Sequence, residues 1–166
     1  MAASFFDRQL AMYASYHRDA RNRATHFVGI PLIIFSLLVP LCWLRFELGG
    51  VVLSAGLLVG LAVLGLWIAL DRVLGLALVL FLAPAWYVAD RIATDGSQAT
   101  GWIVFAVTFV GGWILQLVGH VFEGKRPALV SNLFQALIAP MFLALEVLIW
   151  LGLRREEPHA EAPVRR

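Results

Sequence analysis

Charged side chains are scarce in this chain of 166 residues, of which Asp, Glu, Lys and Arg make up 14%, against about 25% in soluble globular proteins. Hydrophobic residues make up 61% of it, against roughly 45–50% in soluble proteins. A soluble domain of this length cannot bury so much apolar surface. Disorder is also excluded, because disordered chains are poor in aromatic and branched apolar residues. The composition therefore predicts an integral membrane protein.

Cysteine and signal-peptide features are also lacking. The single cysteine, Cys42, lies within an apolar run, which excludes an internal disulfide and a thiolate metal cage. The first 16 residues lack the basic start, apolar centre and small-residue cleavage site of a signal peptide, so we expect the chain to be inserted uncleaved. A net charge of +2 and an isoelectric point near 9.1 do not indicate nucleic acid as a partner, because the basic residues flank apolar runs.

The N-terminal segment, from Ser4 to about Arg18, is amphipathic. Its apolar positions follow at spacings of four, three and four, which place them on one helical face. They are Phe6, Leu10, Tyr13 and His17. Ser4 followed by Asp7 is typical of a helix start, because the serine oxygen accepts from a free backbone amide. The pattern predicts a helix that lies along the membrane surface.

Four uncharged apolar runs follow, each about 17–22 residues long, which is enough to cross roughly 30 Å of hydrocarbon. They are Phe27–Leu44, Gly49–Leu70, Val73–Ala89 and Gly101–Val118. Only Asp71-Arg72 separates the second run from the third, which predicts a tight antiparallel helical hairpin. Neither strand-like alternation nor an internal repeat is evident. The predicted fold class is all-α, a polytopic transmembrane helix bundle of four spans in a single membrane-embedded domain over residues 1–153.

The last apolar run, Leu129–Leu153, contains Asn132, Gln135 and Glu146, and Pro140 interrupts it by removing a backbone donor. Four spans divide the basic residues unequally between the two sides of the membrane. One side carries Arg8, Arg18, Arg21, Arg23, Arg72, Lys125 and Arg126, and the other only Arg45 and Arg91. The richer side is expected to be cytoplasmic, together with the polar tail 154–166 and its arginines. This favours a run that re-enters and returns at Pro140, or lies at the interface, over a single kinked fifth span.

Three of the four histidines are expected to share one side of the membrane. The chain starts before the first span on the cytoplasmic side, and four crossings return it to that side. His17, His26 and His120 therefore lie on the same face, whereas His159 lies in the polar tail and is expected to be solvated. The alternative interpretation is that histidines simply favour membrane interfaces.

These histidines form a candidate metal site. His17 and His26 are nine residues apart, on opposite faces of a continuous helix, so a bend is expected within the polar stretch 18–23. His120, Glu123 and Gln116 share one helical face. Imidazoles and a carboxylate that converge with open coordination positions suit non-haem Fe(II). We predict His17, His26 and His120 as ligands, with Glu123 as a fourth ligand or as the acceptor that orients a ligand ring.

Basic residues beside the histidine motifs are candidates for binding a carboxylate. Arg23, Lys125 and Arg126 either hold an acidic headgroup or serve only as topology signals. Glu146, inside the last apolar run, is either functional or paired with a basic residue at the cytoplasmic edge.

Several motifs resemble those of the Mpo-type 2-hydroxy fatty acid dioxygenases, a family of small multi-pass proteins of fungi and bacteria. The motifs are Tyr16-His17, Asn22, the stretch from His26 to Pro31, the stretch from Gln116 to Ala128, and the later Pro140, Met141-Phe142 and Glu146. The resemblance covers roughly residues 5–150. It implies Fe(II)-dependent α-oxidation, in which a 2-hydroxy fatty acid is shortened by one carbon with O₂. It further implies substrate-binding roles for Asn22 and Gln116.

The resemblance and the residues agree on an interfacial iron site. A 2-hydroxy acid can chelate iron through its carboxylate and hydroxyl while its tail stays in the bilayer. The membrane is expected to be the inner membrane of a bacterium or the endoplasmic reticulum of a eukaryote, with the site on the cytoplasmic side. A haem bundle or a diiron desaturase is disfavoured, because the three histidines lie at span ends and are too few for two irons. A lipid-binding or scaffold protein without catalytic activity remains the alternative, and metal content distinguishes the two.

Overall fold

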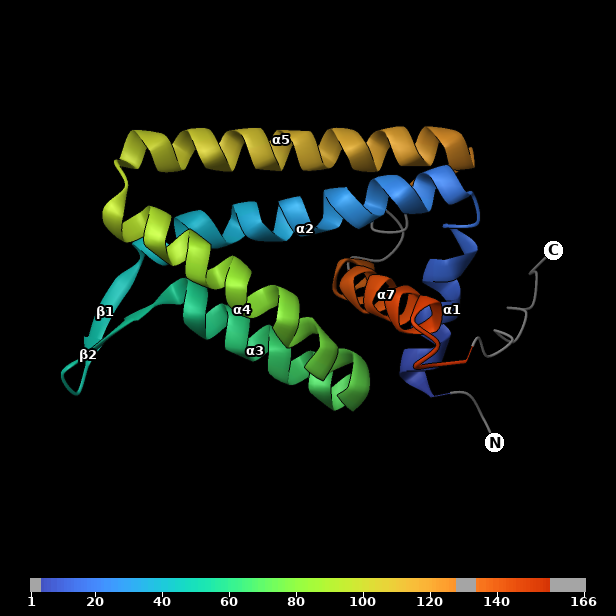
Figure 1. The fold of residues 1–166 in the computed structure, drawn as a ribbon, viewed down its shortest axis with the longest axis horizontal. Coiled ribbons are helices and arrows are strands. Elements are labelled where there is room, and N and C mark those ends of the chain that lie inside the picture. The colour runs from blue at the N-terminus through green and yellow to red at the C-terminus, as the bar shows by residue number, and fades with distance from the viewer. Residues whose placement is uncertain (1–3, 128–133, 156–166) are drawn as a thin grey trace.

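The computed structural model describes residues 4–127 and 134–155, and these are helical apart from one β-hairpin. The elements are α1 (Phe5–Ser15), α2 (Ala20–Trp43), β1 (Arg45–Leu48), β2 (Val51–Ser54), α3 (Ala55–Leu70), α4 (Arg72–Asp95), α5 (Gln98–Glu123) and α7 (Gln135–Trp150). Helices α2 and α5 lie side by side along the long axis, and α3 and α4 form a second pair (Figure 1). Helices α1 and α7 lie together at the end where α2 begins and α5 ends (Figure 1).

The hairpin corrects the all-α prediction and the bounds of the second apolar run. β1 and β2 are antiparallel, and Leu48 pairs with Val51 across a two-residue turn. Gly49 and Gly50 form this turn with φ of 59° and 83°, which glycine adopts at little steric cost. The Gly-Gly pair between apolar segments was therefore the missed signal. Helix α3 begins only at Ala55, and its 16 residues extend about 24 Å.

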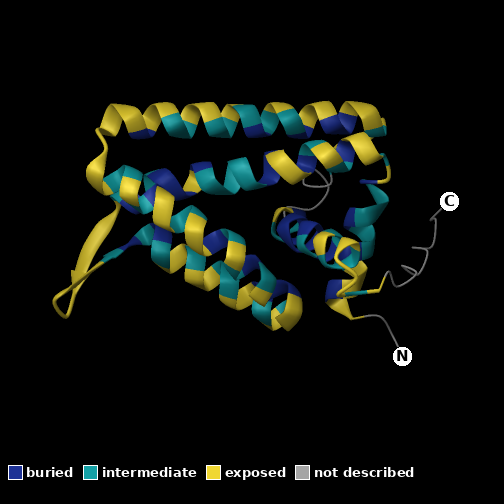
Figure 2. Cartoon of the chain, in the orientation of Figure 1, coloured by how far each residue is buried: buried dark blue, intermediate teal, exposed yellow. Residues whose placement is uncertain are grey.

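Three helices, α2, α4 and α5, are long and apolar enough to cross a membrane. They contain nearly all of the first, third and fourth predicted runs, although each helix is longer than its run. Exposed residues recur along the whole length of α5 (Figure 2), and many exposed side chains are large and apolar, such as Leu80 at 83% and Val121 at 77%. Such surfaces are suited to a lipid environment, since soluble monomers rarely expose large contiguous apolar patches.

The N-terminal helix has the predicted start and the predicted buried face, and its position along the membrane surface stays a prediction. Ser4 and Asp7 form a capping box at the start of α1, and Phe6, Leu10 and Tyr13 are buried. The bend that follows is shorter than predicted, because Asp19 accepts from the backbone N–H of Arg21 and starts α2 there. The chain therefore turns within residues 16–19.

Helices α2 and α5 are antiparallel and approach closely over glycines. A Cβ atom on Gly112 would lie 3.0 Å from the carbonyl oxygen of Gly29, and one on Gly29 would lie 2.6 Å from Nε2 of Gln116. Small residues at such a seam let helices pack in lipid, where close van der Waals contact replaces the hydrophobic effect. The seam places the start of α2 beside the end of α5.

The predicted hairpin of the second and third runs is confirmed as α3 and α4. Asp71 lies between them and accepts from the backbone N–H groups of Val73 and Leu74. Arg154, which follows α7, donates to the same carboxylate at 2.7 Å. The connection therefore ties the segment after α7 to the helical pair.

Helix α7 corrects the expectation of a return at Pro140. The helix continues through Pro140, and Ile138, Met141 and Phe142 around it are buried. The helix packs against α1 and α4 and continues although Pro140 lacks a backbone donor. Whether this 16-residue helix lies at the interface or spans stays a prediction. Asn132 and His159 lie outside the described residues.

Candidate metal centre

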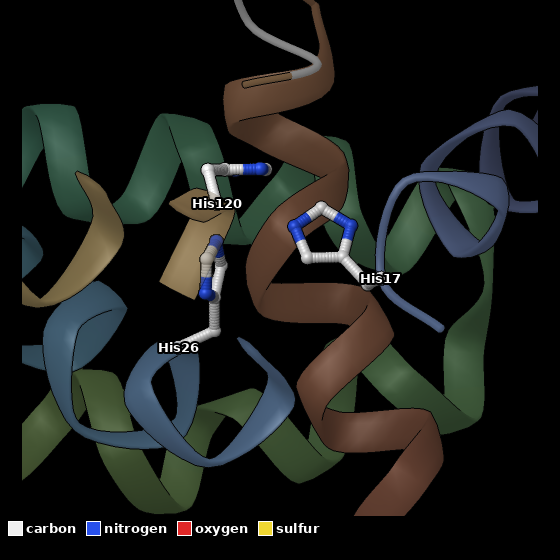
Figure 3. Close-up of side chains that lie close together, drawn as sticks. All are labelled: His17, His26 and His120. Atoms are coloured by element: carbon white, nitrogen blue, oxygen red, sulfur yellow. The ribbon is translucent and has the colours of Figure 1, made fainter. Parts of the chain in front are cut away.

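Three buried histidines from distant parts of the chain converge at the end of the bundle (Figure 3). His17 lies in the connection after α1, His26 in the second turn of α2, and His120 in the last turn of α5. One ring nitrogen from each lies within 4.8 Å of the others, and all three residues are at most 6% exposed. The side chains that were predicted to share one side of the membrane therefore form one cluster.

Backbone carbonyls orient two of the rings. Nδ1 of His17 donates to the carbonyl oxygen of Tyr13 at 2.8 Å, and Nδ1 of His26 donates to that of Asn22 at 2.9 Å. The Tyr13 ring also stacks on His17, with centroids 4.0 Å apart. Each Nδ1–H bond leaves Nε2 with a lone pair, which is the usual arrangement of a metal-binding histidine. For His17 and His26 the acceptors are these backbone carbonyls and not the predicted Glu123 carboxylate.

The free nitrogens fit a divalent cation. Nε2 of His17 and Nδ1 of His120 are buried and have no hydrogen-bond partner among the described residues, which is unusual for polar atoms in a protein interior. Burial is the largest cause that lowers the pKa of His17 to about 4, so its ring is neutral near pH 7. Neutral imidazole is the form that binds metals.

Glu123 joins the connection that carries His17 to the end of α5. Its carboxylate accepts from the backbone N–H of Arg18 at 3.1 Å and of Asp19 at 2.8 Å, and from the side chain of Asn22 at 3.2 Å. These contacts satisfy donors at the start of α2. The carboxylate therefore fixes the position of His17 relative to α5, and coordination by Glu123 stays a prediction.

Asn22 is fully buried and links three parts of the site. Its side-chain amide donates to the Glu123 carboxylate and to the backbone carbonyl oxygen of Tyr16. The backbone carbonyl oxygen of Asn22 accepts from Nδ1 of His26. Asn22 is not among the described residues that line the cavity beside the histidines. Its observed contacts are those of a positioning residue, and the predicted contact with substrate stays a prediction.

The three basic residues predicted to hold a carboxylate do not line the cavity in the described part of the chain. Arg23 pairs with Glu146 of α7 at 3.6 Å, which is the pairing that the sequence analysis gave as one alternative for Glu146. Lys125 donates to the carbonyl oxygen of Ser15 at the end of α1, and Arg126 is exposed.

A cavity of about 120 Å³ adjoins the histidines. Its polar lining comprises Tyr13, His17, His26, Gln116, His120 and Gln135. Its apolar lining comprises Ile30, Ile33, Ile34, Trp113, Pro127, Ala136 and Ala139. The space is large enough for several water molecules, and its mixed lining suits the polar head of an amphipathic molecule.

Several residues of this site had no role predicted from the sequence. Gly119 lies against α2 beside the histidines, and Gln135 begins α7 at the cavity wall. A signal for the glycine was present, because Gly112, Gln116, Gly119 and Glu123 follow at spacings of four, three and four on one face of α5. Tyr13 lay on the predicted buried face of α1 but had no assigned role.

The sequence of this chain matches a known protein family and a yeast protein. Residues 3–150 match the model of a family described as 2-hydroxy-palmitic acid dioxygenase Mpo1-like. The chain is 34% identical over 146 residues to a Saccharomyces cerevisiae protein named 2-hydroxy-palmitic acid dioxygenase MPO1, and the match covers 87% of this chain and 80% of the yeast protein. Comparison with solved structures gives no match.

Proposed function

The chain belongs to the 2-hydroxy-palmitic acid dioxygenase Mpo1-like family, and from this membership we propose that it is an Fe(II)-dependent dioxygenase that shortens 2-hydroxy fatty acids by one carbon. The observation that carries the proposal is the cluster of three buried histidines with unpartnered ring nitrogens beside an amphipathic cavity. Nitrogen donors of this kind suit iron, although zinc and copper share the preference. The family name and the donor set together favour iron.

The reaction balances without a further reductant. The C1–C2 bond of the 2-hydroxy acid breaks, C2 becomes the carboxyl carbon of an acid one carbon shorter, and C1 leaves as CO₂. The substrate gives up four electrons, which reduce one O₂, and one water accounts for the remaining oxygen and hydrogens. Bound iron would supply a site where the substrate carboxylate and hydroxyl chelate and where O₂ is activated.

The residues of this chain hold and shield the reacting groups. His17, His26 and His120 would hold the metal, and the carbonyl bonds to the first two keep those rings oriented. Isoleucines on α2, beginning with Ile30 one turn after His26, line the cavity and exclude water from it. The fatty tail leaves along this apolar side, so the head of the substrate reaches the histidines while its tail stays in lipid.

The proposal includes an orientation in the membrane. We infer that α2, α3, α4 and α5 cross the bilayer and that the histidines lie on the cytoplasmic side, because basic residues are concentrated at that end. A reporter inserted in the turn at Gly49 and Gly50 and a reporter fused after Arg166 are expected to give opposite sides. The C-terminal reporter should be cytoplasmic. Reporters on the same side would contradict the four-span topology.

Metal analysis and turnover test the proposed activity together. Detergent-purified protein is expected to contain about one iron per chain and to convert 2-hydroxypalmitate under air to pentadecanoic acid, detected by mass spectrometry. Removing iron with a chelator should abolish turnover, and adding Fe(II) should restore it. Palmitate serves as the control substrate and should not be consumed. Protein that holds no metal and leaves 2-hydroxypalmitate unchanged would instead support a lipid-binding or scaffold role.

A further inference from the structure

Two glutamine amides in the cavity wall each have a polar atom with no partner among the residues that the structure describes. Gln116 is 7% exposed and Gln135 is 1% exposed, and both line the cavity beside the histidines. Nε2 of Gln116, a donor, and Oε1 of Gln135, an acceptor, are buried and have no hydrogen-bond partner among the described residues. Buried polar groups in native proteins are nearly always paired, so we expect a molecule in the cavity to form a hydrogen bond with each atom.

Gln116 lies one helical turn from two of the histidines. It precedes His120 by four residues on α5, and its Nε2 lies over Gly29, which follows His26 by three residues on α2. One turn of helix rises 5.4 Å. The Gln116 side chain therefore lines the cavity from the wall formed by α2 and α5, and its Nε2 carries N–H groups that no described residue accepts.

Gln135 belongs to a different wall. Its Nε2 donates to Oε1 of Gln9 on α1 at 2.7 Å, and this bond directs its own Oε1 away from Gln9. Gln9, Tyr13 and His17 follow one another at spacings of four, so Gln135 packs against the same side of α1 that leads to His17. The cavity thus has a donor on one wall and an acceptor on another.

We propose that these two amides recognise the two head groups of a 2-hydroxy acid. The proposal rests on the function proposed above and specifies its substrate. The carboxylate accepts a hydrogen bond from Nε2 of Gln116, since a carboxylate offers only acceptors. The 2-hydroxyl group donates to Oε1 of Gln135. An unsubstituted fatty acid offers no donor at C2, so Oε1 of Gln135 stays buried and unpaired when that acid binds.

Such a site discriminates against a fatty acid without a 2-hydroxyl group, because binding of that acid leaves a buried polar atom of the protein unpaired. A site that is built to hydrogen-bond a hydroxyl group rejects the analogue that lacks it more strongly than an apolar pocket rejects a missing methylene. Gln135 is therefore the residue that selects 2-hydroxy acids over ordinary fatty acids. Gln116 holds both classes equally, because both carry the carboxylate.

The test compares the equilibrium binding of two probes to iron-loaded protein without O₂. Dissociation constants of 2-hydroxypalmitate and palmitate are measured by calorimetry for the wild type, Gln135→Met and Gln116→Met, with methionine as an apolar side chain of similar size. Gln135→Met is expected to weaken the binding of 2-hydroxypalmitate roughly 10–100-fold. It should bind palmitate at least as tightly as the wild type does, because the oxygen that palmitate leaves unpaired is gone. Gln116→Met should raise the dissociation constants of both probes by the same factor and so preserve the ratio between them.

Matched controls separate recognition from folding. Gln98→Met, at the exposed start of α5, should alter neither constant. If Gln135→Met does not fold, Gln9→Met provides a second test, because loosening Gln135 should lower the preference for the hydroxy acid by a smaller factor. An unchanged ratio in the folded variants, or an equal loss of preference in Gln116→Met, would overturn the inference.

The two proposals can fail separately. If the wild type consumes 2-hydroxypalmitate but Gln135→Met keeps the full preference, the function stands and the role of Gln135 is wrong. If the wild type does not consume the acid but prefers it through Gln135, the recognition site stands and the proposed reaction is wrong.

Discussion

His120→Ala protein is expected to lose nearly all bound iron and to turn over 2-hydroxypalmitate more than about 100-fold more slowly than the wild type. Loss of an outer hydrogen-bond partner alone typically reduces metal affinity or activity by 10–100-fold, and loss of a ligand exceeds that. His120 supplies one of three ring nitrogens within 4.8 Å of one another, and its Nδ1 has no other partner among the described residues. His17→Ala and His26→Ala are expected to behave alike.

The measurements are iron per chain by mass spectrometry and melting temperature in detergent. His159→Ala is the control, because the sequence places that histidine in a polar tail, and it should change neither iron content nor turnover. Full iron occupancy in His120→Ala would show that the metal is held elsewhere. Unfolding of all three ligand variants would be visible as a lost thermal transition, so a binding defect can be told from a folding defect.

Adding a single methyl group at Gly119, beside the histidines, is expected to lower both iron affinity and stability. A Cβ atom there would lie 2.5 Å from Oδ1 of Asn22 and 3.1 Å from Nδ1 of His26, and would also overlap the Thr25 hydroxyl. Asn22 is fully buried and has no room to retreat. Gly119→Ala should therefore push α5 away from α2 beside the histidines, with iron affinity reduced about 10–100-fold and stability lowered by about 1–3 kcal/mol.

Gly111 on the same helix provides the matched control. A Cβ atom at Gly111 would meet nothing within 4 Å, and alanine is a better helix former than glycine. Gly111→Ala should therefore keep wild-type iron affinity and be as stable as the wild type or slightly more so. Equal behaviour of the two variants in iron titration and thermal melting would contradict close packing of α2 and α5 at Gly119.

Apolar run length predicted most of the fold and missed what depends on local backbone geometry. The runs located α2, α4 and α5, because a helix in lipid must satisfy its backbone groups internally and must be long enough to cross. Run length does not register a two-residue glycine turn, so Gly49 and Gly50 were assigned to a span. Pro140 was expected to reverse the chain, yet α7 continues through it and packs against α1 and α4.

The convergence of the three histidines was predictable because it depends on which side of the membrane each one reaches. In the proposed four-span topology, an even number of crossings brings His120 back to His17 and His26 whatever the tilt of the helices. For Glu146 the sequence indicated a basic partner as one alternative but did not identify it as Arg23. The contacts of Glu123 with Arg18 and Asp19 were not predictable, since they depend on the angle at which the connection after α1 meets the bundle. Gln135 was beyond reach for the same reason, because its role follows from a contact with Gln9, more than a hundred residues earlier.

The wide separation of the histidines along the chain also fixes the order in which the centre can be completed during synthesis. His17 and His26 leave the ribosome early, but the roughly 90 residues that separate His26 from His120 take about 5–20 s to translate. Until α5 is inserted, the side of α2 at Gly29 that packs against α5 lacks its partner, and two histidines cannot complete the cluster. Under the proposed function, loading with metal would therefore be a late event in biogenesis, and a nascent chain that stalls before α5 would present an incomplete centre to membrane quality control.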